Sequence, residues 1–303
     1  MDYLKLIGYK TLLMIAATQI LIKYFLFEPF DIAVSLNEIG FFLLLFASLC
    51  LAAAGNCILE ISNREADLVN QPEKVIVGNS ISEKFAFNMF IGLNIVAVVI
   101  GFFLSNAIGH PGFSALFIIV SALLYLYPTF LKKQLIMGNM FVGILAALTI
   151  ILLGLYDLLP AITPENQNTQ HTVFSILLDY AVFAFLVVWL REMVNDQKNM
   201  DGDHKAGNAS LTLSFGKERT NTIIFIFTLV PLASLLYYMY SYLYGNQTLL
   251  IYLLAFLVGP LLYFLIKILS AKHAKHYVHL RRVLSFVMWA GIVSFALYKF
   301  LLM

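Results

Sequence analysis

The chain has 303 residues, of which 61% are hydrophobic and only 12% are charged. Its mean hydropathy is +0.87, whereas a soluble domain of this length needs a far more charged surface, so the composition predicts a polytopic membrane protein. The formal net charge of +2 says almost nothing about partners, and we expect no nucleic-acid partner for a membrane protein of this composition. The two cysteines, Cys50 and Cys57, have no metal-ligand spacing, and we expect both to be free and buried.

Nine apolar stretches are long enough to cross a bilayer as helices, since each crossing takes about 20 residues. They cover residues 6–27, 39–59, 86–107, 113–131, 138–159, 172–191, 220–242, 248–270 and 282–302. We therefore predict an all-α fold with nine transmembrane helices in a single bundle around a central cavity.

The basic residues are divided unequally between the two sides of this bundle. All 19 lysines and arginines except Lys23 and Lys299 fall before the first stretch or in every second loop after it. The positive-inside rule then places the N-terminus in the cytoplasm and the C-terminus outside. We expect a multi-pass protein of a bacterial-type inner membrane.

Two acidic segments occupy equivalent positions in the chain. "LEISNREADLVNQPEK" (residues 59–74) ends the second stretch, and "REMVNDQKNMDGDHKAG" (residues 191–207) ends the sixth. Because these stretches run in the same direction, we predict one domain, 1–303, with a parallel internal repeat. The pseudo-repeats are about 1–135 and 136–275, followed by an extra helix at 282–302, and such repeats commonly build a site at their interface.

Helical spacing places the polar residues of each segment on one face, within about 60° of arc. The first face carries Asn56, Glu60, Asn63 and Asp67, and the second carries Glu192, Asp196, Asn199 and Asp203. Glu65 and Asp201 point elsewhere. One acidic segment alone is more simply a solvated loop, but two with matched spacing favour a shared site.

Carboxylate and amide oxygens are the ligands that Mg²⁺ prefers, and the ion usually completes its shell with water and substrate phosphates. We therefore predict an Mg²⁺ site that binds a diphosphate. The predicted metal ligands are Glu60, Asn63, Asp67, Asp196, Asn199 and Asp203, of which the four carboxylates are the predicted catalytic residues. The basic residues expected to hold the remaining phosphate oxygens are Arg64, Lys74, Lys132, Lys133, Lys198 and Lys205.

These motifs resemble the two aspartate-rich motifs of the UbiA-type intramembrane prenyltransferases, N-D-x-x-D-x-x-x-D and D-x-x-D-x-x-x-D. The resemblance covers essentially the whole chain. The segments most similar to the family are "VNQPEKVIVG", "DGDHKAG" and "LTLSFGK". "YPTFLKK" is similar to a Tyr–Lys element after the fourth helix, which implies that Tyr127 and Lys132 hold diphosphate. The chain departs from the motifs with Glu60 for the first aspartate and with Asn63 and Asn199 for both middle ones.

The resemblance implies an Mg²⁺-dependent enzyme that transfers a prenyl group from a prenyl diphosphate to a lipophilic acceptor. The most similar branch prenylates a prenylglyceryl phosphate in ether-lipid synthesis, while sister branches use aromatic acceptors of quinone biosynthesis. A non-catalytic, prenyl-lipid-binding paralogue is a further alternative, because Asn63 and Asn199 remove two formal charges. A secondary transporter is disfavoured because the acids lie at one membrane face rather than at the midplane.

Three further polar residues and one basic segment also suggest roles. Asn56 and the intramembrane Asp179 are candidate acceptor-binding residues, although Asp179 would serve equally to bond a neighbouring helix. Asn139 is expected to be a helix-packing and hydrogen-bonding residue. "KHAKHYVHLRR" (residues 272–282) is expected to be a basic patch that meets anionic head groups rather than a metal site.

Overall fold

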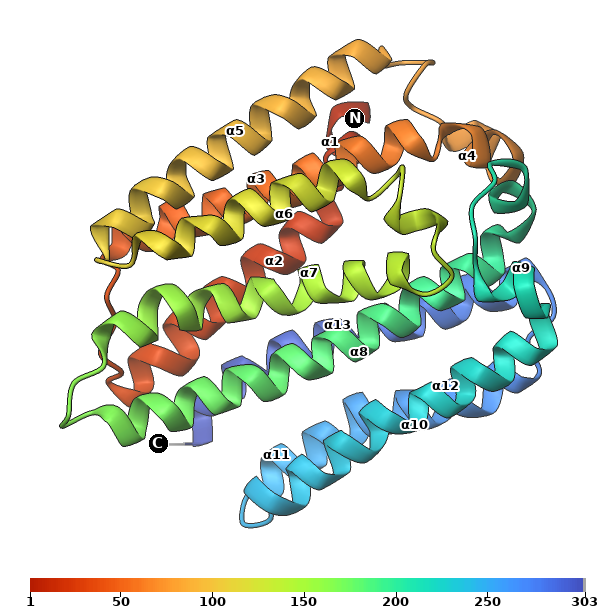
Figure 1. Cartoon of the computed structure of the whole chain (residues 1–303). Helices are drawn as coiled ribbons and strands as arrows, with labels where there is room; N and C mark the ends of the chain where they lie inside the picture. Colours follow the sequence, from red (N-terminus) through yellow and green to blue (C-terminus); the bar gives the residue numbers. More distant parts are fainter. Residues whose placement is uncertain (302–303) are drawn as a thin grey trace.

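The computed structural model describes residues 1–301, with side chains described through Tyr298, so the side chain of Lys299 lies outside the described part. Eight helical segments of that part are long and apolar enough to cross a membrane. They are Tyr9–Phe30, Glu38–Ser62, Glu83–Ala107, Met137–Ala161, Gln167–Lys205, Lys217–Tyr242, Gln247–Leu269 and Ala274–Tyr298. Figure 1 shows them side by side in one bundle, which confirms the predicted all-helical membrane fold.

The first half of the chain contains α1 (Asp2–Leu6), α2 (Tyr9–Leu21), α3 (Glu38–Ser62), α4 (Arg64–Asn70), α5 (Glu83–Ala107) and α6 (Ser114–Leu126). Helix α3 begins where the Asn37 side chain accepts a hydrogen bond from the Gly40 N–H at 2.8 Å, which satisfies one of the free donors of the first turn. Ser82 caps α5 in the same way. The apolar helix at the expected fourth span covers only Pro111–Leu126, so this element is shorter than the predicted 113–131.

The second half contains α7 (Met137–Leu153), α8 (Gln167–Lys205), α9 (Leu211–Phe215), α10 (Lys217–Tyr242), α11 (Gln247–Leu253), α12 (Gly259–Leu269) and α13 (Ala274–Leu301). Helix α8 has 39 residues and continues well past residue 191, where the sequence predicted that the sixth span would end. The second acidic segment is therefore part of a helix and not a loop.

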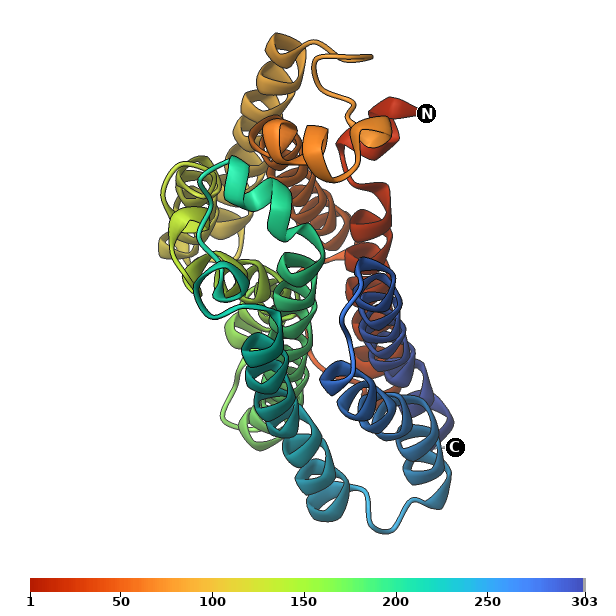
Figure 2. The ribbon, with the colours of Figure 1, turned by 90° about the vertical axis from the view of Figure 1, so that its right-hand side faces the viewer.

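Both acidic segments lie at the same end of the bundle, which we call the motif end. The connections that follow α3, α6, α8 and α12 all reach this end (Figure 1). Figure 2 looks onto the motif end and shows α4 beside the end of α8. Segments far apart in the sequence thus meet where the polar residues are concentrated.

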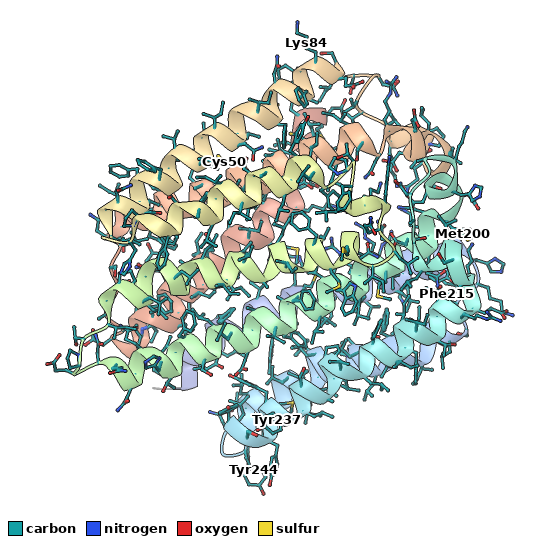
Figure 3. All side chains as sticks on the ribbon, in the orientation of Figure 1. Cys50, Lys84, Met200, Phe215, Tyr237 and Tyr244 are labelled. Carbon is teal, nitrogen blue, oxygen red and sulfur yellow. The ribbon has the colours of Figure 1, made fainter. Side chains whose placement is uncertain are left out.

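The outer surface of the bundle is apolar, as a lipid-facing surface must be. Along α5, Ile95, Val99 and Phe103 are among the exposed large hydrophobic side chains. At the far end of α10, Tyr237 and Tyr244 project outward (Figure 3) and are 67% and 79% exposed. Tyrosine is typical of the membrane–water interface, so these positions mark the boundary opposite the motif end.

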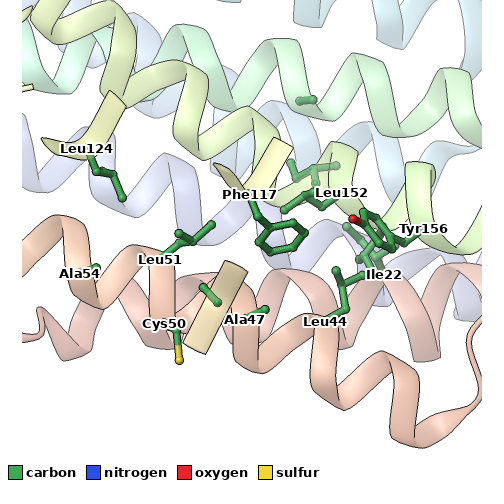
Figure 4. Packing of buried hydrophobic residues seen from close by; sticks show 14 of the residues in the cluster. Ile22, Leu44, Ala47, Cys50, Leu51, Ala54, Phe117, Leu124, Leu152 and Tyr156 are labelled. Atoms are coloured by element: carbon green, nitrogen blue, oxygen red, sulfur yellow. The ribbon is translucent and has the colours of Figure 1, made fainter. Parts of the chain in front are cut away.

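Small and large side chains alternate in the core. Ala47, Cys50 and Ala54 of α3 belong to the same buried cluster as Phe117 and Tyr156 from other helices (Figure 4). Gly101 of α5 lets α6 approach closely, because an added Cβ there would lie 2.4 Å from the ring of Phe117. Cys50 and Cys57 are free and buried, as the sequence predicted.

The end of the bundle opposite the motif end contains a buried ion pair. Lys23 Nζ lies 3.1 Å from Asp157 Oδ2, and the two side chains are 5% and 0% exposed. The other oxygen of Asp157 accepts the N–H of Leu36 at 3.0 Å, and the ammonium lies 5.5 Å from the ring centre of Phe41. The pair therefore joins the spans Tyr9–Phe30 and Met137–Ala161 to the start of α3.

Both partners of the ion pair lie in π-helical turns. Ile22–Phe27 and Gly154–Leu158 are π-helices, and each leads into a proline-containing 3₁₀ helix, Glu28–Phe30 and Leu159–Ala161. The spans that contain them would correspond to each other in the predicted repeat of residues 1–135 and 136–275. The repeat itself stays a prediction.

We expect Lys23→Met to lower the free energy of unfolding by about 3–5 kcal/mol, because it leaves the Asp157 carboxylate buried without its partner. The double variant Lys23→Met/Asp157→Asn should recover most of this loss, since it removes both charges and keeps an acceptor for Leu36. Denaturant titration of purified protein in detergent measures the free energy of unfolding of the single and the double variant. Equal losses in the single and double variants would contradict the ion-pair interpretation.

Candidate functional site

The two acidic segments are held together by Asn70, at the end of α4. Its side-chain nitrogen donates to the carbonyl oxygen of Asn199 at 3.1 Å, and its side-chain oxygen accepts from the N–H of Gly202 at 3.1 Å. An added Cβ at Gly202 would lie 2.3 Å from the carbonyl oxygen of Ala66. The absence of a side chain at Gly202 is therefore what lets α4 pack directly against α8.

The local structure of the two segments differs. Helix α3 ends at Ser62, and α4 begins at Arg64 after a break at Asn63. In α8, by contrast, one uninterrupted helix carries Glu192 through Asp203. The first polar face is therefore divided between two helices, which the assumption of one continuous helix from Asn56 to Asp67 did not allow for.

Lys132 lies between the two segments. It belongs to the 3₁₀ helix Leu131–Lys133, its ammonium donates to Asn63 Oδ1, and it lies 4.0 Å from Asp203 Oδ1. Burial lowers the pKa of Lys132, and the nearby carboxylate of Asp203 opposes that shift. Burial likewise raises the pKa of Asp67, against the attraction of Lys132 and Lys198. A single ammonium thus balances part of the acidic charge of both segments.

Two further α8 residues have distinct surroundings. Asp196 Oδ2 accepts a hydrogen bond from the side chain of Asn139, in α7, at 2.7 Å. Asn199 Oδ1 is buried and has no hydrogen-bond partner in the described part of the chain. A buried acceptor without a donor is costly, and a cation at that oxygen would satisfy it.

The described residues include no group of three or more His, Cys, Asp or Glu side chains placed to hold a metal ion by themselves. Mg²⁺ is commonly bound through one or two carboxylates plus substrate phosphates and water. The residues present, with the free oxygen of Asn199 between Asp196 and Asp203, fit an ion that arrives with a diphosphate. They do not resemble a site that holds a metal without substrate.

The structure does not bring all of the expected phosphate-binding residues together. Lys198 and Lys74 lie near enough to Asp67 to interact with its charge. Arg64, however, lies over Gly78 and pairs with Glu83 at 3.8 Å, and Lys205 is exposed.

An apolar cavity begins at this site and continues into the bundle. Over each of α3, α7 and α8, its lining extends for eleven residues, which is about 16 Å of helix. At the motif end it is lined by Asn56, Leu59, Tyr127, Phe141 and Arg191. Tyr127 is 7% exposed and stacks on Phe141 with ring centres 5.5 Å apart. Its hydroxyl lies close enough to Asp196 and Asp203 to interact electrostatically with their carboxylates.

The two candidate acceptor-binding residues lie in different environments. Asn56 lines the cavity, but its side-chain nitrogen already donates to Ile7 at 3.1 Å and to Ala52 at 2.9 Å. Asp179 is exposed on α8 and is not among the described residues that line the cavity.

Sequence reasoning missed two residues near the site and did not identify the partner of a third. Asn139 was interpreted as a helix-packing and hydrogen-bonding residue, and the structure shows that its partner is Asp196. Arg191 was counted only for orientation, although it lines the cavity. Arg281 was assigned to a surface patch, although it interacts with Glu192 and Lys198. The sequence could have indicated the position of Arg281, because its helical spacing places it beside the apolar face of α13.

The fold and this arrangement define a multi-pass membrane protein with a polar site at the mouth of an apolar cavity. The model of the UbiA prenyltransferase family matches residues 32–287, so the chain belongs to that family. It is 25% identical over 261 residues to a digeranylgeranylglyceryl phosphate synthase from Methanosphaera stadtmanae, covering 84% of this chain and 87% of that protein.

Two solved structures share the fold. One comes from work on digeranylgeranylglyceryl phosphate synthase in membranes, with a TM-score of 0.66, 20% identity and coverage of 97% and 98% of the two chains. The other is a UbiA homologue from Archaeoglobus fulgidus bound to DMAPP and Mg²⁺, with a TM-score of 0.59, 13% identity and coverage of 98% and 99%.

We expect Gly202→Ala to destabilise the protein by about 1–3 kcal/mol, because the added methyl group overpacks the contact between α4 and α8. Gly92→Ala is the matched control, since Gly92 also lies in a helix and has open space around its Cβ position. Denaturant titration in detergent measures both variants. An equal effect of the two substitutions would show that the close approach at Gly202 is not required.

Proposed function

We propose that this protein transfers a prenyl group from a prenyl diphosphate to the hydroxyl group of a prenylglyceryl phosphate, in the presence of Mg²⁺. The observation that carries the proposal is the meeting of both polar segments, through Lys132 and Asn70, at the mouth of one apolar cavity. Such a cavity suits the prenyl chain, and the polar mouth suits its diphosphate. The acceptor class follows the relatives' printed name, since prenylating geranylgeranylglyceryl phosphate gives a digeranylgeranylglyceryl phosphate.

In this proposal each part of the site has a distinct task. Asp67, Asp196, Asn199 and Asp203 would hold Mg²⁺ together with phosphate oxygens, and the bound ion would neutralise charge on the departing diphosphate. Lys132 and Lys74 would bind the remaining phosphate oxygens. Glu60 is half-buried at the end of α3, next to the cavity-lining Leu59, where it would complete the acidic wall.

The chemistry requires one bond to break and one to form. The bond between the first prenyl carbon and the diphosphate oxygen breaks, and the diphosphate leaves with the electron pair. The carbon then bonds to the acceptor oxygen, whose proton passes to the diphosphate or to water. Aromatic faces stabilise a positive charge on the prenyl carbon, and Tyr127 and Phe141 are the stacked rings nearest the mouth.

The orientation of the protein follows from the same proposal. The motif end carries most of the lysines and arginines, so we place this end and the N-terminus in the cytoplasm, with the C-terminus outside. Both charged substrates would then enter from the cytoplasmic side. An aromatic acceptor of quinone biosynthesis and a non-catalytic lipid-binding role remain the alternatives that the tests below distinguish.

We expect Asp67→Asn and Asp203→Asn each to lower prenyl transfer by about a hundredfold or more, since each removes charge that holds the diphosphate with its ion. Glu65→Gln and Asp201→Asn are matched controls in the same segments, because both side chains are exposed, and they should retain near-normal rates. Purified protein in detergent is assayed with radiolabelled geranylgeranyl diphosphate, Mg²⁺ and geranylgeranylglyceryl phosphate or 4-hydroxybenzoate. Binding of the diphosphate without turnover on either acceptor would support a non-catalytic role instead.

Replacing each of the two motif asparagines by aspartate should change metal binding to a different extent. Asn199→Asp is expected to tighten Mn²⁺ binding by about tenfold, because it puts a charge on a buried oxygen that has no partner. Asn63→Asp should have a smaller effect, since its oxygen already accepts from Lys132 and the new charge would pair with that ammonium. Electron paramagnetic resonance of Mn²⁺ with geranylgeranyl thiolodiphosphate measures both affinities. A larger gain at residue 63 would refute this account of the metal position.

A further inference from the structure

A second group of basic side chains borders the cavity, on the seam between α8 and α13. Among the described residues that line the cavity, Arg191 alone is charged, and its side chain is 17% exposed. The function proposed above leaves it without a task. Its position inside the cavity wall raises the question of which anion it meets.

Arg281 lies on the same seam. Met288 and Phe295 of α13 line the cavity. Arg281 precedes Met288 by seven residues, which is close to two full turns, so both lie on one face of α13 with Arg281 about 10 Å nearer the motif end. Arg191 Nη1 lies 3.8 Å from the sulfur of Met288, and Arg281 is close enough to Arg191 to interact with its charge. Arg191 therefore lines the cavity, and the helical register places Arg281 on the same face of α13 as the cavity-lining Met288.

The hydrogen-bonding capacity of Arg191 is only partly used. Its Nε and Nη2 atoms donate to the same oxygen of Glu192, at 3.1 and 2.9 Å. Its Nη1 atom faces the thioether of Met288, which is a weak acceptor. A guanidinium group has five donors, and leaving some of them against apolar surface is costly. Oxygen atoms of a ligand would satisfy them.

The charge of this group identifies the class of anion. Arg191 forms a salt bridge with Glu192, whereas Arg281 and Lys198, which lie near each other, form none in the described part of the chain, although Glu192 attracts Arg281 and Asp67 and Asp203 attract Lys198. Two cations match a phosphate monoester, which carries about −1.5 to −2 charge near neutral pH. A carboxylate, with a single charge, would leave one cation unmatched.

We propose that Arg191, Arg281 and Lys198 form a subsite for the phosphate monoester of the lipid acceptor, separate from the diphosphate position at Lys132. The inference rests on the proposed function and specifies where its second substrate binds. The acceptor's head group lies on the α8–α13 side of the mouth, and the prenyl diphosphate lies on the α4 side. The two substrates thus approach each other across α8.

Arg281→Gln is the first test, with Arg282→Gln as its matched control. Arg282 is the next residue along α13 and is exposed, away from this seam. Protein in phosphatidylcholine nanodiscs is titrated separately with geranylgeranylglyceryl phosphate, with 4-hydroxybenzoate, and with geranylgeranyl thiolodiphosphate plus Mg²⁺. We expect Arg281→Gln to weaken acceptor binding by about tenfold or more and to leave the thiolodiphosphate affinity nearly unchanged. Arg282→Gln should change neither affinity.

A variant that keeps the charge separates binding from helix packing. Arg281→Lys is expected to recover most of the acceptor affinity, whereas a purely structural loss at this position would not be repaired by lysine. Equal weakening of both ligands, no effect on either, or tighter binding of 4-hydroxybenzoate than of the glyceryl phosphate would each overturn the subsite. Binding is measured without turnover, so an inactive protein that still binds the acceptor through Arg281 would contradict the proposed reaction and not the subsite.

Discussion

The close approach of α4 to α8 is the constraint on which the site depends. Two polar segments separated by more than 120 residues share a site only if their helices touch, and the contact is made at a position without a side chain, Gly202. Asn70 then uses both ends of its amide to bond the backbone of α8. Both hydrogen bonds go to backbone groups of α8. This contact therefore sets the position of α4 against α8 independently of the charged side chains around it.

Once the segments are in contact, their charges must be balanced. Asp67 and Asp203 approach from different helices, and the ammonium of Lys132 near them reduces their repulsion. The asparagines at 63 and 199 lower the negative charge further than in the aspartate-rich motifs they resemble. The acidic charge at the site is thus reduced, and the oxygen of Asn199 has no partner among the described residues.

The sequence was sufficient for the membrane class, the family and most of the helices, because hydrophobic length and helical period are local properties. The family prediction is confirmed by the match over residues 32–287. The sequence was insufficient where tertiary contacts decide. Arg64 lies in the first motif but turns towards Glu83, and Asn139 lies in an apolar stretch but bonds Asp196. The apolar span was predicted to end at residue 191 because the last turns of α8 are polar, whereas the helical spacing assumed for residues 192–203 agrees with the helix, which continues to Lys205.

The two ends of the bundle are built differently, and this difference bears on how lipid substrates would be held. At the end opposite the motifs, the Lys23–Asp157 pair is completed internally by Leu36, so its charges need no ligand. At the motif end, Arg191 keeps unused donors and Asn199 an unused acceptor. At the motif end a charged head group would meet the unused donors of Arg191 and the unpartnered oxygen of Asn199, and an apolar chain attached to it would extend into the cavity. This polarity would orient both lipid substrates in parallel, with their reacting groups near the same mouth.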